Sequence, residues 1–414
     1  MSPHAQPPKY MKKNTQPRHE AGVRPTSRDF RLIEYNEAVH SSELELEPIK
    51  MREEFALLKN EWDQFLSKTQ TPSPFMSWDY LDVWWDVYAD RGFEPKLFIA
   101  RDTEQHIIGA APLMISQRGA FAGTRSKFRH LSFIGSLGGA AGESLELPAR
   151  PGYEVALGEA VADHILENLQ GQWDVLYLSM IPHDSRSTNT MIKKLAQAGI
   201  PIKTISSTAS PIMPITSNWD DHISEQRIKE RERIGAAFLN GVESTKDLQL
   251  MRAGLEIGLE PAYEQLIRLS KLSDDDSFAR VFATTDMVDF HWKLAPRLLE
   301  QDKLFFGLVK IGDEFAGAVY DFMDHGKMWA RQALWNPKFE DQNIKLILNT
   351  WSDKAAFDRG LEEIDYLLGI SGRDVSKTRY TRTLNIYEAA CPKSLGGKLF
   401  SLARGIDRLL ESKN

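Results

Sequence analysis

The 414-residue chain is predicted to be an α/β protein, with mixed sheets covered by helices, and three observations support this class. Short apolar runs, typical of strands, alternate with longer segments in which apolar residues recur at helical spacing. The composition is that of a soluble globular protein, with 42% hydrophobic and 26% charged residues. The order of strands and helices recurs in the second half, which predicts two related halves.

The chain is expected to divide into a tail and two domains. Residues 1–28 are rich in proline, glutamine and basic residues and nearly lack aliphatic ones, so they are expected to form a disordered basic tail. A charged helix predicted over 219–239 separates the first domain, 29–218, from the second, 219–414 with its connecting helices. Opposite charges at helical spacing are typical of a solvated, self-paired face.

The elements of the first half follow from apolar spacing and from turn residues. Pro72 and Pro74 separate two predicted helices, and Gly199 with Pro201 ends the last one. The predicted order is helix Glu53–Ser67, helix Phe75–Tyr88, strand Lys96–Ala100, strand Ile107–Ile115, strand Leu131–Ile134, helix Tyr153–Leu169, strand Asp174–Ser179 and helix Ser187–Ala198.

The second half is predicted to repeat this order after helical material over 261–299. Gly312-Asp313 forms the turn between its first two strands. The predicted elements are strand Leu304–Ile311, strand Glu314–Met323, strand Lys327–Trp335, helix Ile344–Arg359 and strand Ile364–Leu368.

Composition also excludes several classes of function. A single cysteine, Cys391, rules out a disulfide framework, and the histidines form no metal motif, so no metal is expected. The net charge of −7 argues against broad nucleic-acid binding. No apolar run reaches the roughly 18 residues that span a bilayer, and the N-terminus has no secretory pattern. We therefore expect a cytoplasmic protein without stable membrane insertion.

Several short motifs, taken in order, resemble the CelD-like and FemAB-related acetyltransferases. The segment 74–85, with Ser77-Trp78 and Trp84-Trp85, is similar to the entry helix of that family. The remaining motifs that carry the resemblance are Ile108–Leu113, Leu131–Gly135, Trp173–Leu178, Phe315–Tyr320 and Asp365–Gly369 with Lys377 downstream.

This resemblance implies two tandem GNAT-like acyl-CoA N-acyltransferase halves. It implies transfer of an acyl group, from acetyl-CoA or another acyl-CoA, to an amine of a small molecule or of an envelope or polysaccharide precursor. Two alternatives stay open: a degenerate GNAT pair that binds a ligand or partner without turnover, and a FemAB-type transferase that uses aminoacyl-tRNA. The acceptor and the oligomeric state are not predicted.

The resemblance also places the pyrophosphate of the donor at the N-terminus of the helix that follows the fourth GNAT strand, where free N–H groups attract anions. In the second half this is the loop Asn336–Asn343, whose Lys338, Gln342 and Asn343 are the candidate donors. The loop lacks glycine and contains Glu340 and Asp341, which repel phosphate. A plain helix start capped by Asp341 or Asn343 is the alternative.

Acyl transfer to an amine needs groups that move protons and stabilise the carbonyl oxygen. The candidate catalytic residues are Asp365, Tyr320 and Tyr380, with Asp321 also considered. The candidate substrate-binding residues are Arg331, Lys377 and Trp85. An ordinary salt bridge between Asp365 and Lys377, an exposed sheet-face position for Arg331, and core packing of Trp85 are the corresponding structural alternatives.

Two further segments are given non-catalytic interpretations. The glycine-rich segment Gly135–Gly142 lacks a basic residue and matches no phosphate-loop pattern, so it is expected to edge the cleft between the halves. The run His183-Asp184-Ser185 is expected to cap a helix rather than to form a catalytic triad, because a triad is a spatial arrangement.

Overall fold

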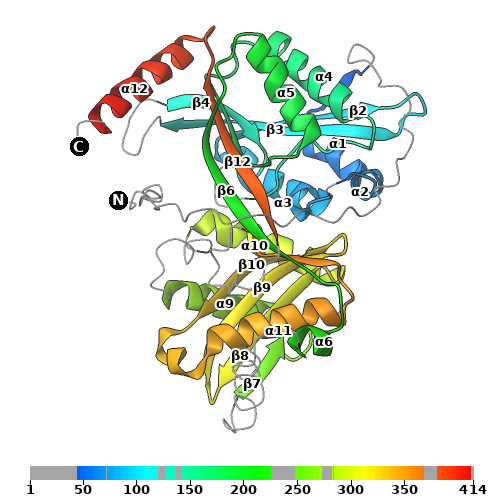
Figure 1. Cartoon of the computed structure of the whole chain (residues 1–414), viewed down its shortest axis with the longest axis vertical. Coiled ribbons are helices and arrows are strands. Elements are labelled where there is room, and N and C mark those ends of the chain that lie inside the picture. Colours follow the sequence, from blue (N-terminus) through cyan, green and yellow to red (C-terminus); the bar gives the residue numbers. More distant parts are fainter. Residues whose placement is uncertain are drawn as a thin grey trace, which may run out of the picture.

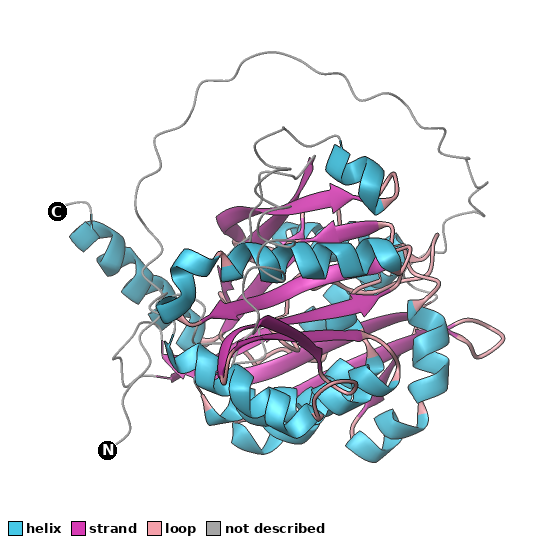
Figure 2. Ribbon diagram, turned by 90° about the horizontal axis from the view of Figure 1, so that it is seen from below, coloured by secondary structure: helices cyan, strands magenta, loops and turns pink. Residues whose placement is uncertain are grey.

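A computed structural model of the chain describes residues 44–70, 72–119, 127–136, 142–224, 248–272, 282, 284–367 and 380–411. The described strands form one twelve-stranded sheet with the order β1-β2-β3-β4-β5-β12-β6-β11-β10-β9-β8-β7. Figure 1 shows two lobes, one built around each end of this sheet. Figure 2 shows helices on both sides of the strands. The predicted mixed α/β fold is therefore confirmed, whereas residues 1–28 lie outside the described residues.

The first half follows the predicted order closely. Ser77 begins α3 because its side chain accepts a hydrogen bond from the Tyr80 amide, as N-cap serines do. The predicted helix 53–67 is divided at Leu58, where one helix ends and the next begins. The elements are β1 (Leu46–Ile49), α1 (Arg52–Leu57), α2 (Lys59–Leu66), α3 (Trp78–Tyr88), β2 (Phe93–Arg101), β3 (Ile107–Gly119), β4 (Lys127–Phe133), α4 (Glu154–Glu167), β5 (Val175–Pro182) and α5 (Arg186–Gln197).

The second half is built from an antiparallel meander and one parallel strand. Only residues 219–224 of the predicted charged helix are described, as α6 (Trp219–Ser224). The other elements are β7 (Leu248–Arg252), α9 (Leu259–Leu272), α10 (Thr285–Glu300), β8 (Leu304–Ile311), β9 (Glu314–Asp324), β10 (Lys327–Trp335), a 3-10 helix η6 (Pro337–Gln342), α11 (Ile344–Asp358) and β11 (Glu363–Asp365).

Two long strands connect the halves. β6 (Lys203–Pro214) pairs with β11 of the second half and with β12 (Tyr380–Ala390), which in turn pairs with β5 of the first half. The C-terminal helix α12 (Leu395–Glu411) contacts β4 and β12, so the end of the chain returns to the first lobe (Figure 1). The division into domains 29–218 and 219–414 stays a prediction. Under this division, β12 and α12 belong to the second domain by sequence but pack against the first lobe.

Among the described strands, each half contains one parallel pair, and each pair is very short. β4 and β5 pair only through two residues each, beginning with His130 opposite Val175. β10 and β11 pair only from Lys327–Trp329 to Glu363–Asp365, and a bulge interrupts β10 between Trp329 and Gln332. Past Trp329, β10 pairs with β9 alone among the described strands, so the sheet separates there. This separation positions the candidate site.

Candidate functional site

One face of the second-half sheet carries a connected set of polar residues. Lys327 lies opposite Glu363, and Trp329 lies opposite Asp365, so these four side chains share a face. Residues of the first half touch this face, since the Phe75 ring lies 5.9 Å from the Trp329 ring. The site therefore lies at the junction of the two halves.

Asp365 is fully buried at the end of β11, with 0% of its surface exposed. Its carboxylate accepts hydrogen bonds from Ser210 Oγ at 2.6 Å and from the Leu367 amide at 2.8 Å. Arg382 of β12 forms an ion pair with it. Burial raises the pKa of Asp365, and the Arg382 charge opposes that rise. Asp365 thus joins β6, β11 and β12 at one point.

Glu363 interacts with the other polar side chains on this face. It accepts from Lys327 Nζ at 2.9 Å and from the Tyr380 hydroxyl at 2.7 Å, and Arg382 Nη2 lies 3.5 Å away. Burial raises the pKa of Glu363, but these partners, Lys327 first, outweigh burial and bring the pKa below its usual value. Burial and the Glu363 carboxylate raise the pKa of Tyr380, so this phenol keeps its proton at neutral pH.

Arg382 connects the network to the first half. Its guanidinium lies over the Trp329 ring, 5.7 Å from the centroid, and its Nη1 donates to Ser144 Oγ at 3.5 Å. The pairing of β12 with β6 brings Arg382 opposite Ser210 and so beside Asp365. Sequence reasoning missed this residue, because its position depends on the register of strands far apart in the chain.

Arg331 lies in the β10 bulge and is 8% exposed, so the exposed sheet-face alternative is wrong. Its Nη1 lies 3.9 Å from Glu143 Oε1 of the first half, and its guanidinium lies over the Phe75 ring at 5.8 Å. Its Nε has no hydrogen-bond partner among the described residues.

Asp321 fixes the bulge from the opposite face of the sheet. Its carboxylate accepts from the Gln332 amide at 3.4 Å and from Ser352 Oγ of α11 at 2.6 Å. The buried carboxylate thereby ties the interrupted strand β10 to the helix that covers it, which holds the separated part of β10 in place.

Tyr320 lies in the core beneath the junction, fully buried on β9. Its hydroxyl is 3.3 Å from Nδ1 of His291 on α10. Burial raises the pKa of Tyr320 well above, and lowers that of His291 well below, the usual values, so both side chains are neutral at physiological pH. Sequence reasoning did not single out His291, because a lone histidine on a helix gives no signal.

The N-terminus of α11 is the predicted place for the donor's pyrophosphate. Asn343 is the N-cap residue in left-handed conformation, and its side chain makes no cap hydrogen bond. Gln342 and Asn343 are exposed, whereas Lys338 pairs with Glu314 on the surface. The helix end therefore presents exposed side-chain amides, while Glu340 and Asp341 remain exposed beside it.

Other predicted residues lie apart from the junction network or outside the described residues. The Trp85 ring stacks on Phe55 at 6.1 Å in the first-half core, which fits the core-packing interpretation. Lys377 and the segment 137–141 lie outside the described residues. Ser185 is the N-cap residue of α5, but its side chain makes no cap hydrogen bond and has no partner among the described residues, so no triad forms.

Within the described part of the chain, no three acidic, histidine or cysteine side chains come close enough to hold a metal ion. None of the described helices is both long and apolar enough to cross a membrane.

Comparison with known proteins gives a domain match and several structural neighbours. A family model described as "Acetyltransferase (GNAT) domain" matches residues 240–377. The crystal structure of FemX is similar, with 11% identity, a TM-score of 0.53, and coverage of 83% of this chain and 98% of that chain. A protein of unknown function from Bacteroides thetaiotaomicron is 8% identical, with a TM-score of 0.50, and covers 84% of this chain and 100% of that chain. No curated protein matches the sequence.

The matched segment contains β7 to β11 and α11, and therefore the bulged strand, the separated parallel pair and most of the junction face. FemX shows that this fold extends over both halves. The second half of the chain therefore contains an acetyltransferase (GNAT) domain, and the fold of the whole described chain resembles that of FemX.

Proposed function

We propose that the protein is an N-acyltransferase that moves an acyl group from acyl-CoA to an amine. The observation that carries this proposal is the three-residue parallel pairing of β10 and β11, followed by the bulge at Trp329–Gln332. Beyond it, the β10 edge that would face β11 has no described strand partner, so an extended donor arm can lie along it. The GNAT domain match covers this region.

The buried guanidinium group of Arg331 is proposed to contact the reacting carbonyl, and the half-buried guanidinium of Arg382 lies beside it at the junction. Arg331 has a buried Nε without a partner among the described residues, and its guanidinium would stabilise negative charge at the carbonyl oxygen. Asp365 is fully buried under three donors, so we assign it a positioning role, holding Arg382, rather than proton abstraction.

Tyr380 is proposed as the proton donor to the leaving thiolate. Its raised pKa keeps it protonated, and it is 46% exposed. The amine nitrogen attacks the thioester carbon, the new C–N bond forms, and the C–S bond breaks. The thiolate takes the Tyr380 proton, and the proton released by the amine restores the phenol through solvent.

The exposed start of α11 is proposed to bind the pyrophosphate through its free N–H groups with Gln342 and Asn343. Lys338 would contribute only after leaving Glu314. Because Glu340 and Asp341 lie beside this helix end, we expect weaker donor binding than a glycine-rich loop would give. We place the reaction in the cytoplasm, with a small molecule or an envelope precursor as acceptor.

The test is stabilisation by acetyl-CoA together with thiol release. A ligand at 100 times its dissociation constant adds about 2.7 kcal/mol to stability. We expect acetyl-CoA at millimolar concentration to raise the melting temperature, and a panel of amines to reveal acceptor-dependent release of free CoA. Tyr380→Phe should keep the shift and slow the release, whereas the control variant Tyr153→Phe, at a half-buried tyrosine of the first half, should change neither.

Absence of both the shift and the release would overturn the acyl-CoA proposal. Transfer from an aminoacyl-tRNA under the same conditions would then favour the FemAB-type alternative, and ligand binding without turnover would favour a degenerate pair.

A further inference from the structure

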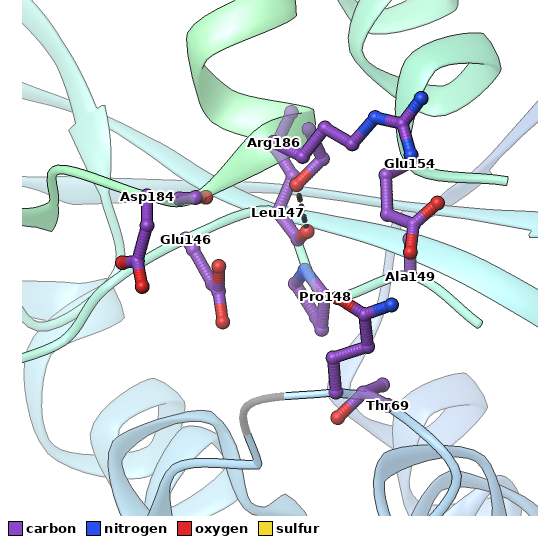
Figure 3. Close-up of a pocket in the computed structure, with 11 residues that line it drawn as sticks. Thr69, Glu146, Leu147, Pro148, Ala149, Glu154, Asp184 and Arg186 are labelled. Carbon is purple, nitrogen blue, oxygen red and sulfur yellow. Dashed lines mark hydrogen bonds between the residues drawn. The ribbon is translucent and has the colours of Figure 1, made fainter. Parts of the chain in front are cut away.

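A pocket in the first half lies outside the junction and carries mainly acidic groups. Its cavity volume is about 90 Å³, and it lies between the residues that follow α2, the segment 146–149 and the first turns of α4 and α5. Figure 3 shows the carboxylates of Glu146 and Asp184 on one side of Pro148 and that of Glu154 on the other. Arg186 is the one basic residue among the described residues that line it.

Two buried polar side chains of the pocket have unused hydrogen-bonding capacity. Glu154 is 6% exposed, and its Oε2 accepts from the Gly152 amide at 2.9 Å, while its Oε1 has no partner among the described residues. Ser185 is 4% exposed, and its Oγ is likewise unpartnered although it stands at the start of α5. Buried polar atoms are normally satisfied, so these two indicate a missing partner.

The walls of the pocket are held firmly. The Leu147 amide donates to Thr188 Oγ1 at 3.0 Å, and Ser187 Oγ donates to the Leu147 carbonyl at 2.6 Å. The Ala110 amide donates to the Pro148 carbonyl at 3.0 Å. A pocket whose backbone is fixed on both sides binds a ligand with little ordering cost.

The chemistry of the lining selects the ligand. Carboxylates and a free hydroxyl accept hydrogen bonds, so they match a donor-rich cation and repel a phosphate. Within the described residues these carboxylates do not come close enough to hold a metal ion. Acceptors on both sides of Pro148 suit a molecule with a positive charge at each end. We infer that this pocket binds a small aliphatic diamine or polyamine, with one ammonium on Glu154 and Ser185 and another on Glu146 and Asp184.

The same segment connects this pocket with the junction. Glu143 contacts Arg331 and Ser144 contacts Arg382, and Glu146 follows two residues later. The inference concerns binding alone, so it stands whether or not the protein transfers an acyl group.

The test is calorimetric titration of the full chain with 1,5-diaminopentane and, as a neutral control of equal length, 1,5-pentanediol. We expect saturable one-to-one binding of the diamine that weakens as salt rises, and no binding of the diol. Glu154→Gln, which keeps an oxygen for the Gly152 amide, should weaken diamine binding at least tenfold. Ser185→Ala should weaken it severalfold.

Two further variants distinguish a specific site from general attraction to an acidic protein. Asp184→Asn changes an exposed carboxylate of the pocket and should weaken binding without affecting folding, whereas Asp313→Asn removes an exposed carboxylate in the second half and should leave binding unchanged. No diamine binding at millimolar concentration, or equal loss in Asp184→Asn and Asp313→Asn, would overturn the inference.

Discussion

The junction residues show how buried charge is tolerated in this fold. Asp365, Glu363 and Arg382 form a compact network in which each carboxylate has several donors. Removing one member of a buried ion pair is costlier than removing the pair, because the remaining charge stays without compensation.

We therefore predict that Arg382→Met lowers the free energy of unfolding by about 3–5 kcal/mol, the range for breaking a buried pair. Urea unfolding monitored by tryptophan fluorescence measures this change. Arg268→Met, on an exposed position of α9, is the control and should have little effect. Equal free energies of unfolding for the two variants would contradict the claim that the ion pair of Arg382 stabilises the fold.

A second residue-scale prediction concerns pH. The pKa of Glu363 is lower in the folded chain than its usual value, so its ionised form stabilises the fold, and this contribution is lost as the pH falls through the folded pKa. Glu363→Gln should therefore destabilise the protein near neutral pH and should converge with the wild type in acid. Urea unfolding across a pH series tests this convergence, and a stability difference independent of pH would contradict it.

Sequence reasoning identifies single residues but not their partners. Asp365 is a candidate through the family resemblance and Arg331 through its place among apolar residues of a strand, and the structure buries both at the junction while their catalytic roles stay predictions. Their partners Arg382 and Glu143 gave no signal, because only the register of β12 and the path of the segment after β4 bring them there.

At the scale of elements, the start of α12 is held by close backbone packing. A Cβ on Gly397 would lie 2.1 Å from the Cys391 carbonyl oxygen and 2.9 Å from that of Asp174. A Cβ on Gly405, in the same helix, would meet nothing within 4 Å. Backbone atoms cannot rotate away, so only the first position requires glycine.

We predict that Gly397→Ala destabilises the protein by about 1–3 kcal/mol through overpacking. Gly405→Ala should be neutral or should stabilise by up to about 1 kcal/mol, because alanine favours a helix over glycine. Thermal unfolding of the two variants gives the comparison. Equal melting temperatures would mean that α12 does not dock as described.

Element prediction was accurate for segments with strong apolar patterns. The bounds of β10 were predicted as Lys327–Trp335 and are observed so. β6 and β12 were not predicted, because β6 is largely exposed over residues 203–207 and neither strand has a continuous apolar run. These two strands are stabilised by backbone hydrogen bonds to each other and to strands of both halves, and not by an apolar pattern of their own.

For the molecule as a whole, β6 and β12 make the two halves interdependent, because β6 of the first half pairs with β11 of the second and β12 of the second pairs with β5 of the first. β12 lies between β5 and β6, so a fragment that ends before residue 380 leaves β5 without this neighbour. An unpaired strand edge of this kind exposes backbone groups and promotes association.

We predict that residues 44–218 alone do not fold to a stable monomer and that co-expression with residues 219–414 restores a soluble complex. Size-exclusion chromatography and circular dichroism of the fragment and the complex test this. A cooperatively unfolding monomer of 44–218 would show that the halves are independent.

The central claim is that the donor lies between β10 and β11 in the second half, and hydrogen exchange with and without acetyl-CoA tests it most directly. We predict slower exchange of amides over residues 330–346, with no change over α4 (Glu154–Glu167), the helix of the first half that corresponds to α11. Protection confined to α4, or no protection at millimolar acetyl-CoA, would contradict the claim.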